Sequence, residues 1–286
     1  MSRTQADPLA VQRKIILGLL VFLTAAAWIS LTWQAAGMNM PMVSPTMGMG
    51  PPLFLAIWIV MMVAMMFPTA APMILTFHRV QGAKRRRGEA FVSTWVFVGA
   101  YILIWTLAGI AAYLGAAGAE ALAERVGLST PIIARIGGVI LLLAGIYQFS
   151  PLKDVCLAKC RTPMTFIMTS WRDGTGGAIR MGIAHGIYCL GCCWLLFLIL
   201  FPLGIMNVAA MALVTLLIFT EKTLPTGRSI ARVAGVALAV YGITVLAVPE
   251  VLPTNGAGGS MPMSMSGSTH GMPGKENDAH GMHSRP

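Results

Sequence analysis

Residues 185–193 place four metal-binding side chains close together in an otherwise apolar segment: His185, Cys189, Cys192 and Cys193. On an α-helix these positions fall on one arc about 100° wide, so one face would present an imidazole and three thiols. Polar side chains are rare at membrane depth and usually face a bundle interior or a pathway. Sulfur ligands favour Cu(I), and imidazole suits copper and zinc. The pattern therefore predicts a soft-metal site, with Cu(I) favoured and zinc as the alternative ion.

One straight helix cannot bring all four side chains to one ion. His185 and Cys193 would lie about 12 Å apart along the helix axis, whereas metal bonds to sulfur or nitrogen are about 2.0–2.3 Å long. We therefore expect either a helix break at Gly186 or Gly191, or ligands from a second segment.

Two other segments offer sulfur. Four methionines recur within one apolar run, where Pro68 and Pro72 should kink the helix: Met61, Met62, Met65 and Met66. Cys156 and Cys160 are four residues apart, so a helical turn would point both thiols the same way. Either group could complete the metal site. Methionine also fills apolar cores, and the two cysteines could be ordinary loop residues.

Further methionines and histidines lie in polar segments and are candidates for auxiliary metal capture: Met38, Met40, Met42, His270, Met272, His280, Met282 and His283. The segment that follows Val251 is rich in Gly, Ser and Pro and has few large apolar residues, which predicts disorder. Packing does not readily explain methionines in such a tail.

The composition places these residues in a membrane protein. Only 10% of the 286 residues are charged and 56% are hydrophobic, whereas soluble domains are about 25% charged. About 20 apolar residues span a bilayer as a helix, and the runs are continuous rather than alternating, which excludes a barrel. We expect an all-α, polytopic transmembrane helix bundle of about seven helices (six to eight), over residues 15–35, 53–77, 91–115, 132–149, 181–202, 205–220 and 231–249. The first run also resembles a signal peptide, but it is longer than one requires, and we expect a retained helix.

Basic residues predict the orientation. Most of the 20 Lys and Arg residues lie before residue 15 or within 79–87, 153–180 and 222–232. The positive-inside rule then places the N-terminus in the cytoplasm and the C-terminus outside. The expected parts are a cytoplasmic N-terminus (1–14), a bundle (15–250) with a Met-rich outer loop (36–52) and a Cys-containing cytoplasmic loop (150–180), and a disordered Met/His-rich tail (251–286). Topology and anionic lipid headgroups account for the net charge of +10, so the lipid bilayer, not nucleic acid, is the expected partner.

Two polar residues lie near the ends of predicted helices. Glu221 could couple to transport as a proton acceptor or hard ligand, or it could pair with a basic loop residue. It could also form a solvated interfacial ion pair with Lys222 or Arg228. We expect His78 to be an interfacial residue rather than a ligand.

Residues 50–250 resemble a bacterial family of predicted metal-binding integral membrane proteins. The resemblance rests on a His-Gly-x-x-Cys-x-Gly-Cys-Cys-Trp signature at 185–194, on the Met-rich stretch 61–68, and on Tyr147-Gln148, 151–153, Cys156, Cys160-Arg161, 171–174, Met206-Asn207 and Glu221-Lys222. It implies a multi-pass protein of the bacterial inner membrane that binds a metal.

Four functions remain open at this point. The first, which we favour, is soft-metal transport across the membrane or delivery within it, to a metallochaperone or a metalloenzyme under assembly. The second is a thiol–disulfide oxidoreductase that uses Cys189 and Cys192, although no thioredoxin-like pattern surrounds them. The third is a haem protein with His185 as an axial ligand, and the fourth is an assembly scaffold whose cysteines only pack. The chain has no phosphate-binding loop, which argues against ATP-driven pumping.

Overall fold

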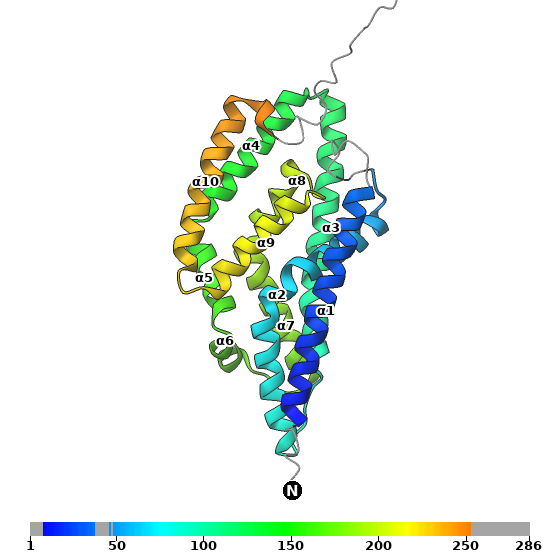
Figure 1. The fold of residues 1–286 in the computed structure, drawn as a ribbon, viewed down its shortest axis with the longest axis vertical. Coiled ribbons are helices and arrows are strands. Elements are labelled where there is room, and N and C mark those ends of the chain that lie inside the picture. Colours follow the sequence, from blue (N-terminus) through cyan, green and yellow to red (C-terminus); the bar gives the residue numbers. More distant parts are fainter. Residues whose placement is uncertain (1–7, 38–45, 47, 253–286) are drawn as a thin grey trace, which may run out of the picture.

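The computed structural model describes residues 8–37, 46 and 48–252, a part of the chain that contains helices and no strand (Figure 1). The helices are α1 (Pro8–Gly37), α2 (Pro51–Arg86), α3 (Thr94–Val126), α4 (Thr130–Tyr147), α5 (Pro151–Arg161), α6 (Pro163–Ser170), α7 (Gly174–Leu198), α8 (Leu200–Leu203), α9 (Val208–Thr223) and α10 (Gly227–Ala247), followed by the 3-10 turn η1 (Pro249–Val251). The predicted all-α bundle is confirmed.

Within this described part, six helical stretches are long and apolar enough to cross a membrane: α1, α2, α3, α4, α7 with α8, and α10. The remaining predicted span corresponds to α9, which has only 16 residues. Several helix ends differ from the prediction. Helix α3 continues to Val126 because residues 116–123 are rich in alanine, the best helix former, and it stops where Gly127 adopts a left-handed conformation, φ 64°.

Helix α2 is the central element of the bundle. It packs against α1, α3 and α9, and 56% of its apolar window is buried, compared with 17% for α1. The indole Nε1 of Trp58 donates a hydrogen bond to the Trp105 carbonyl at 2.9 Å, which ties α2 to α3. By contrast, large apolar side chains such as Phe22, Leu114 and Val233 are exposed on the outer helices, as expected for a surface that faces lipid.

Glycines allow two helix pairs to approach closely. A Cβ atom on Gly145 of α4 would lie 2.6 Å from the carbonyl oxygen of Gly235 in α10, and one on Gly182 of α7 would lie 2.5 Å from that of Phe97 in α3. Such small-residue contacts are typical of helices that associate in membranes. They hold α10 beside α4, and α7 beside α3 (Figure 1).

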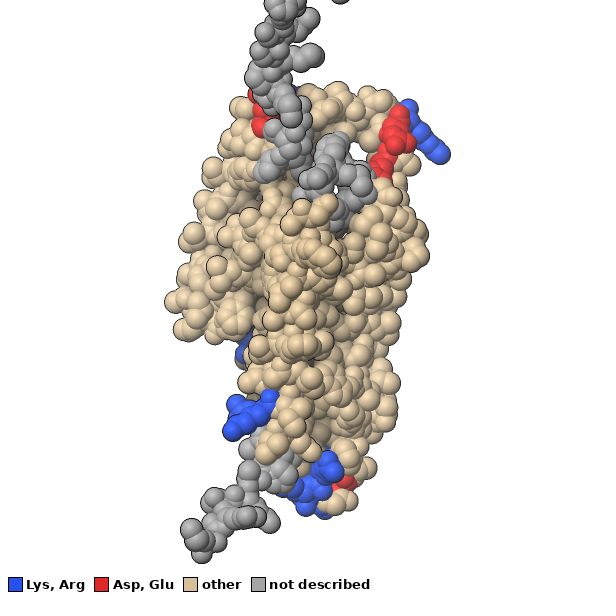
Figure 2. All heavy atoms as spheres, turned by 45° about the vertical axis from the view of Figure 1, so that its right-hand side comes forward, with Lys and Arg blue, Asp and Glu red and all other residues tan. Residues whose placement is uncertain are grey.

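Basic side chains gather at one end of the molecule. The face of the molecule drawn in Figure 2 carries Lys and Arg at its lower end, while the middle of that face is almost free of charged side chains. Helix α1 begins at this end and α2 finishes there with Lys84, Arg85 and Arg86. The basic segment 79–87, which follows the predicted helix 53–77, is therefore helical for most of its length, because α2 continues to Arg86.

Candidate metal centre

Helix α7 carries the predicted cysteine face without interruption from Gly174 to Leu198. The predicted helix break does not occur, because its glycines serve close packing instead. A Cβ atom on Gly186 would lie 2.9 Å from Ile104 Cβ, and one on Gly191 would lie 2.8 Å from Cys156 Sγ. Other segments must therefore supply further ligands if the face binds a metal.

Cys189 lies where several helices meet, and its side chain is 0% exposed. Its Sγ atom is 3.2 Å from the hydroxyl of Tyr101 in α3 and 3.0 Å from Nζ of Lys222 in α9. The thioether Sδ of Met66 in α2 lies 4.0 Å from the same sulfur. Cys189 is thus the member of the face that other helices surround with polar and sulfur atoms.

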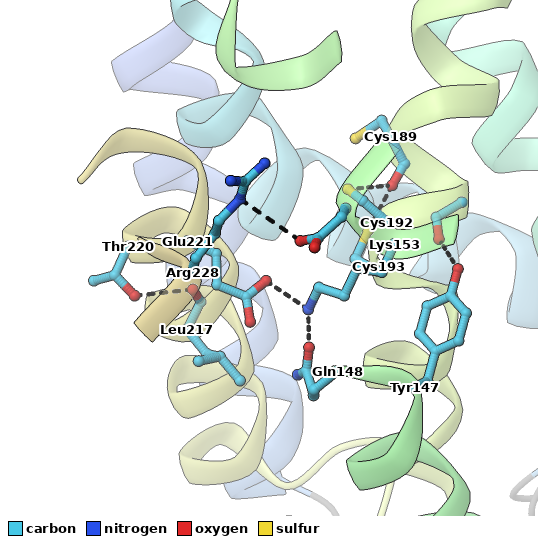
Figure 3. A network of polar contacts seen from close by, with 12 residues as sticks. Tyr147, Gln148, Lys153, Cys189, Cys192, Cys193, Leu217, Thr220, Glu221 and Arg228 are labelled. Atoms are coloured by element: carbon cyan, nitrogen blue, oxygen red, sulfur yellow. Dashed lines mark hydrogen bonds and ion pairs between the residues drawn. The ribbon is translucent and has the colours of Figure 1, made fainter. Parts of the chain in front are cut away.

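The other two cysteines of the face point back toward Cys189. The Sγ atoms of Cys192 and Cys193 donate to its carbonyl oxygen at 3.1 and 2.8 Å (Figure 3). From α5, the half-buried Cys160 is a neighbour of Cys189 and Cys192. Residues 151–161 form a helix, so Cys156 and Cys160 are one helical turn apart. Cys156 packs against Gly191 of α7.

His185 occupies an aromatic cage one turn before Cys189. Its ring stacks on Phe97 and Tyr101 with centroid distances of 5.9 and 5.4 Å, and Phe166 lies at 5.8 Å. The side chain is buried, and neither ring nitrogen has a hydrogen-bond partner among the described residues. His185 therefore shares the face but forms no hydrogen bond with the thiols of the described cysteines.

The methionine stripe of α2 is buried, but its members differ in what they contact. Met61, Met62, Met65 and Met66 are each at most 1% exposed. The sulfur atom of Met66 contacts the sulfur atom of Cys189, whereas Met61 lines a separate cavity described below. Because Met61 and Met66 are five residues apart on α2, the position of α2 along its axis decides which methionine reaches the thiols.

A buried ion pair stands next to the cysteine face. Nζ of Lys153 in α5 lies 2.7 Å from Oε2 of Glu221, and both side chains are 2% exposed. Lys153 also donates to the side chain of Gln148 (Figure 3). A solvated interfacial pair of Glu221 with Lys222 or Arg228 is therefore wrong, and Arg228 instead lies 3.8 Å from Asp154.

The side chain of His78 is largely enclosed by its neighbours in the fold. It is 9% exposed, and its Nδ1 atom lies 3.3 Å from the hydroxyl of Thr94. Helix α2 continues beyond this position to Arg86, and the interfacial position of His78 stays a prediction.

The distances between side chains limit which residues could bind a soft metal ion together. Within residues 8–37, 46 and 48–252, no three His, Cys, Asp or Glu side chains are grouped to hold an ion by themselves. A mixed thiol and thioether set fits better. Two sulfur atoms that are each about 2.3 Å from an ion, 120° apart, lie about 4.0 Å from one another. This is the separation of Cys189 Sγ and Met66 Sδ, 4.0 Å.

The sequence profile of the copper chaperone family PpoB2 matches residues 55–245, well over half of the chain. The chain belongs to this family. The expected relation to metals is thereby confirmed at the level of the family, whose description names copper. Comparisons with curated proteins and with solved structures gave no match.

The PpoB2 match contains Met66, His185 and all five cysteines. It leaves out the candidates for auxiliary capture, which are Met38, Met40, Met42, His270, Met272, His280, Met282 and His283. These eight residues also lie outside the described part of the structure.

Three residues of the site escaped prediction from sequence. Tyr101, Lys153 and Lys222 come from helices other than α7, and spacing along one helix cannot find them. For Lys222 a signal existed, since it neighbours Glu221 in an apolar helix, where a charge needs a buried partner. Tyr101 gives no such signal.

Proposed function

We propose that this chain is an integral membrane copper chaperone that binds Cu(I) at Cys189 and Met66 and delivers it within or across the bacterial inner membrane. A thiol of Cys192 or Cys160 would complete the coordination. The observation that carries the proposal is the buried sulfur pair on α7 and α2, 4.0 Å apart.

Lys222 explains why the site would select a monovalent ion. An ammonium buried among apolar side chains needs an anionic partner, and Cys189 as a thiolate would supply it at 3.0 Å. Binding of Cu(I) neutralises the thiolate, so Lys222 then needs a second anion, which the thiol of Cys192 or Cys160 would supply by losing its proton as the ion binds. Zn(II) would bring one further positive charge into a medium of low dielectric constant, where repulsion is strong.

Burial favours metal binding over thiol–disulfide exchange. An oxidoreductase needs a cysteine that the disulfide of a substrate can reach. Cys189, Cys192 and Cys193 are each at most 2% exposed. An ion that travels between sulfur ligands can reach such a position, whereas a protein disulfide cannot. The partner would be a copper-accepting protein, either a metallochaperone or a metalloenzyme under assembly.

Titration of the purified protein with Cu(I) against a colorimetric Cu(I) chelator tests this function. We expect Cys189→Ser to weaken binding of the first equivalent by at least about tenfold. Met66→Leu should remove a thioether from the sulfur shell seen by X-ray absorption. Cys156→Ser is the matched control, because Cys156 packs against Gly191 and its loss should leave the affinity unchanged. Wild-type affinity in Cys189→Ser would refute the proposal.

A further inference from the structure

A second group of methionines lines a cavity that includes none of the cysteines. Met49 precedes α2, Met61 lies within α2, and Met206 lies between α8 and α9. The three line one cavity of about 10 Å³ together with Trp58 and apolar neighbours. Three separate segments thus each contribute a methionine to the lining of one small space.

The lining of this cavity restricts what could occupy it. It contains no acidic or basic side chain, and the indole N–H of Trp58 is already bonded to Trp105. The remaining donors are neutral thioethers, which bind soft monovalent ions and not Mg²⁺ or Ca²⁺. The volume matches a single water-sized species, so a hydrated ion or an organic ligand does not fit.

Packing alone does not account for the cavity. Methionine is flexible and adapts to fill irregular gaps. Met61 and Met206 are at most 2% exposed, so both are held inside the protein, yet a space remains between them. The side chain of Trp58 also lines this space, and an indole ring can favour a cation through its π electrons.

We propose that Met49, Met61 and Met206 form a second Cu(I) site, with thioether ligands only, from which the ion passes to Cys189. This transfer, unlike the site itself, rests on the proposed function. Met61 and Met66 are about 7.5 Å apart along α2, and the buried Met62 and Met65 lie between them. Each step exchanges one sulfur ligand for another, so copper remains Cu(I) throughout. A neutral thioether site holds the ion less tightly than a thiolate site, which directs the ion toward Cys189.

Ag(I) is a redox-inert probe for this site. In protein labelled with ¹³C at the methionine methyl groups, NMR of the detergent-solubilised chain reports each thioether separately. After the first equivalent of Ag(I) has loaded Cys189, we expect the methyl signals of Met49, Met61 and Met206 to shift together with the second equivalent. The signal of Met211, which is 0% exposed but does not line the cavity, should stay in place.

Two substitutions of equal size test the assignment. Met206→Leu conserves volume and removes one donor, so the second equivalent should bind roughly tenfold more weakly. Met211→Leu is the matched control and should bind as the wild type does. If Met206→Leu unfolds the chain, Met61→Leu carries the same test.

The outcomes for the two sites are distinguishable. If the second equivalent shifts none of the three methyl signals, or binds equally well in Met206→Leu and Met211→Leu, the cavity is only packing and this inference is overturned, while Cys189 can still bind copper. If the three signals respond but Cys189→Ser leaves the first equivalent unchanged, the thioether site stands and the proposed function fails.

Discussion

Two buried lysines define the electrostatics of the candidate site. Lys153 pairs with Glu221 at 2.7 Å, and Lys222 lies 3.0 Å from the sulfur of Cys189. Each buried charge therefore has a partner on another helix. Such pairs contribute little stability compared with apolar residues, but removing one partner leaves the other charge uncompensated.

Glu221→Gln should therefore destabilise the bundle. We expect a loss of about 3–5 kcal/mol in the free energy of unfolding, because Lys153 would stay charged and buried. The measurement is reversible unfolding in mixed detergent micelles. The double variant Lys153→Met with Glu221→Gln should recover most of the loss.

The exposed pair of Arg228 and Asp154 provides the control for this experiment. Its atoms lie 3.8 Å apart and both side chains are at least half exposed, so Asp154→Asn should change stability by less than about 1 kcal/mol. An equal effect of Asp154→Asn and Glu221→Gln would contradict the importance of burial.

The sequence predicted the thiol face, but not its partners. Spacing along α7 places Cys189, Cys192 and Cys193 together because helical periodicity is local. The contact with Met66 depends on where α2 lies along its axis, and the contact with Lys222 depends on where α9 ends. Both are consequences of tertiary packing, which the pattern of one helix does not contain.

At the scale of helices, α7 and α3 are held in close contact by Gly182 and Gly186. A methyl group at either position would meet α3 at less than 3.0 Å. This contact fixes Tyr101 beside Cys189, at 3.2 Å, so the helix pair also shapes the candidate metal centre.

Gly182→Ala should separate the two helices and lower stability by about 1–3 kcal/mol through overpacking. It should also weaken Cu(I) binding, because α3 would shift relative to Cys189. Unfolding in detergent and Cu(I) titration provide the two measurements.

Gly176→Ala on the same helix serves as its control. A Cβ atom there meets nothing within 4 Å, so its effect on stability should stay within about 0.5 kcal/mol. If Gly182→Ala were equally neutral, the close contact would have no structural role.

Hydropathy predicted which segments form long helices, but it predicted the first and last residues of those helices less accurately. Apolar runs identify α1, α2, α3, α4, α7 and α10 because burial in lipid demands length and continuity. Helix α2 continues to Arg86 through residues of mixed polarity, where backbone propensity decides the end. The short apolar stretch after Cys160 forms α6 and packs against α2 and α5, which no period in the sequence indicates.

At the scale of the whole molecule, charge is distributed unequally between the two ends (Figure 2). Arg85 lies at the basic end, whereas Glu124 lies near the end of α3, at the other end of the chain's long axis (Figure 1). The positive-inside rule assigns the basic end to the cytoplasm.

Labelling of intact cells with a membrane-impermeant thiol reagent tests this orientation. In a background without native cysteines, Glu124→Cys should be labelled and Arg85→Cys should be protected until the cells are opened. Both positions are exposed, so accessibility within the fold does not differ. The reverse pattern would invert the orientation.

The shortness of α9 has a consequence for biogenesis. Its 16 residues measure about 24 Å, less than the hydrocarbon core of about 30 Å, and the helix carries Glu221 and Lys222 near its end. Such a segment inserts poorly by itself. However, the contacts of these two charges are synthesised before α9: Cys189 lies in the spanning helix α7, and Lys153 lies in the short helix α5. Helix α9 would therefore insert beside residues that are already in place to pair with Glu221 and Lys222. A substitution of Lys153 in α5 should then appear first as incomplete membrane insertion of α9.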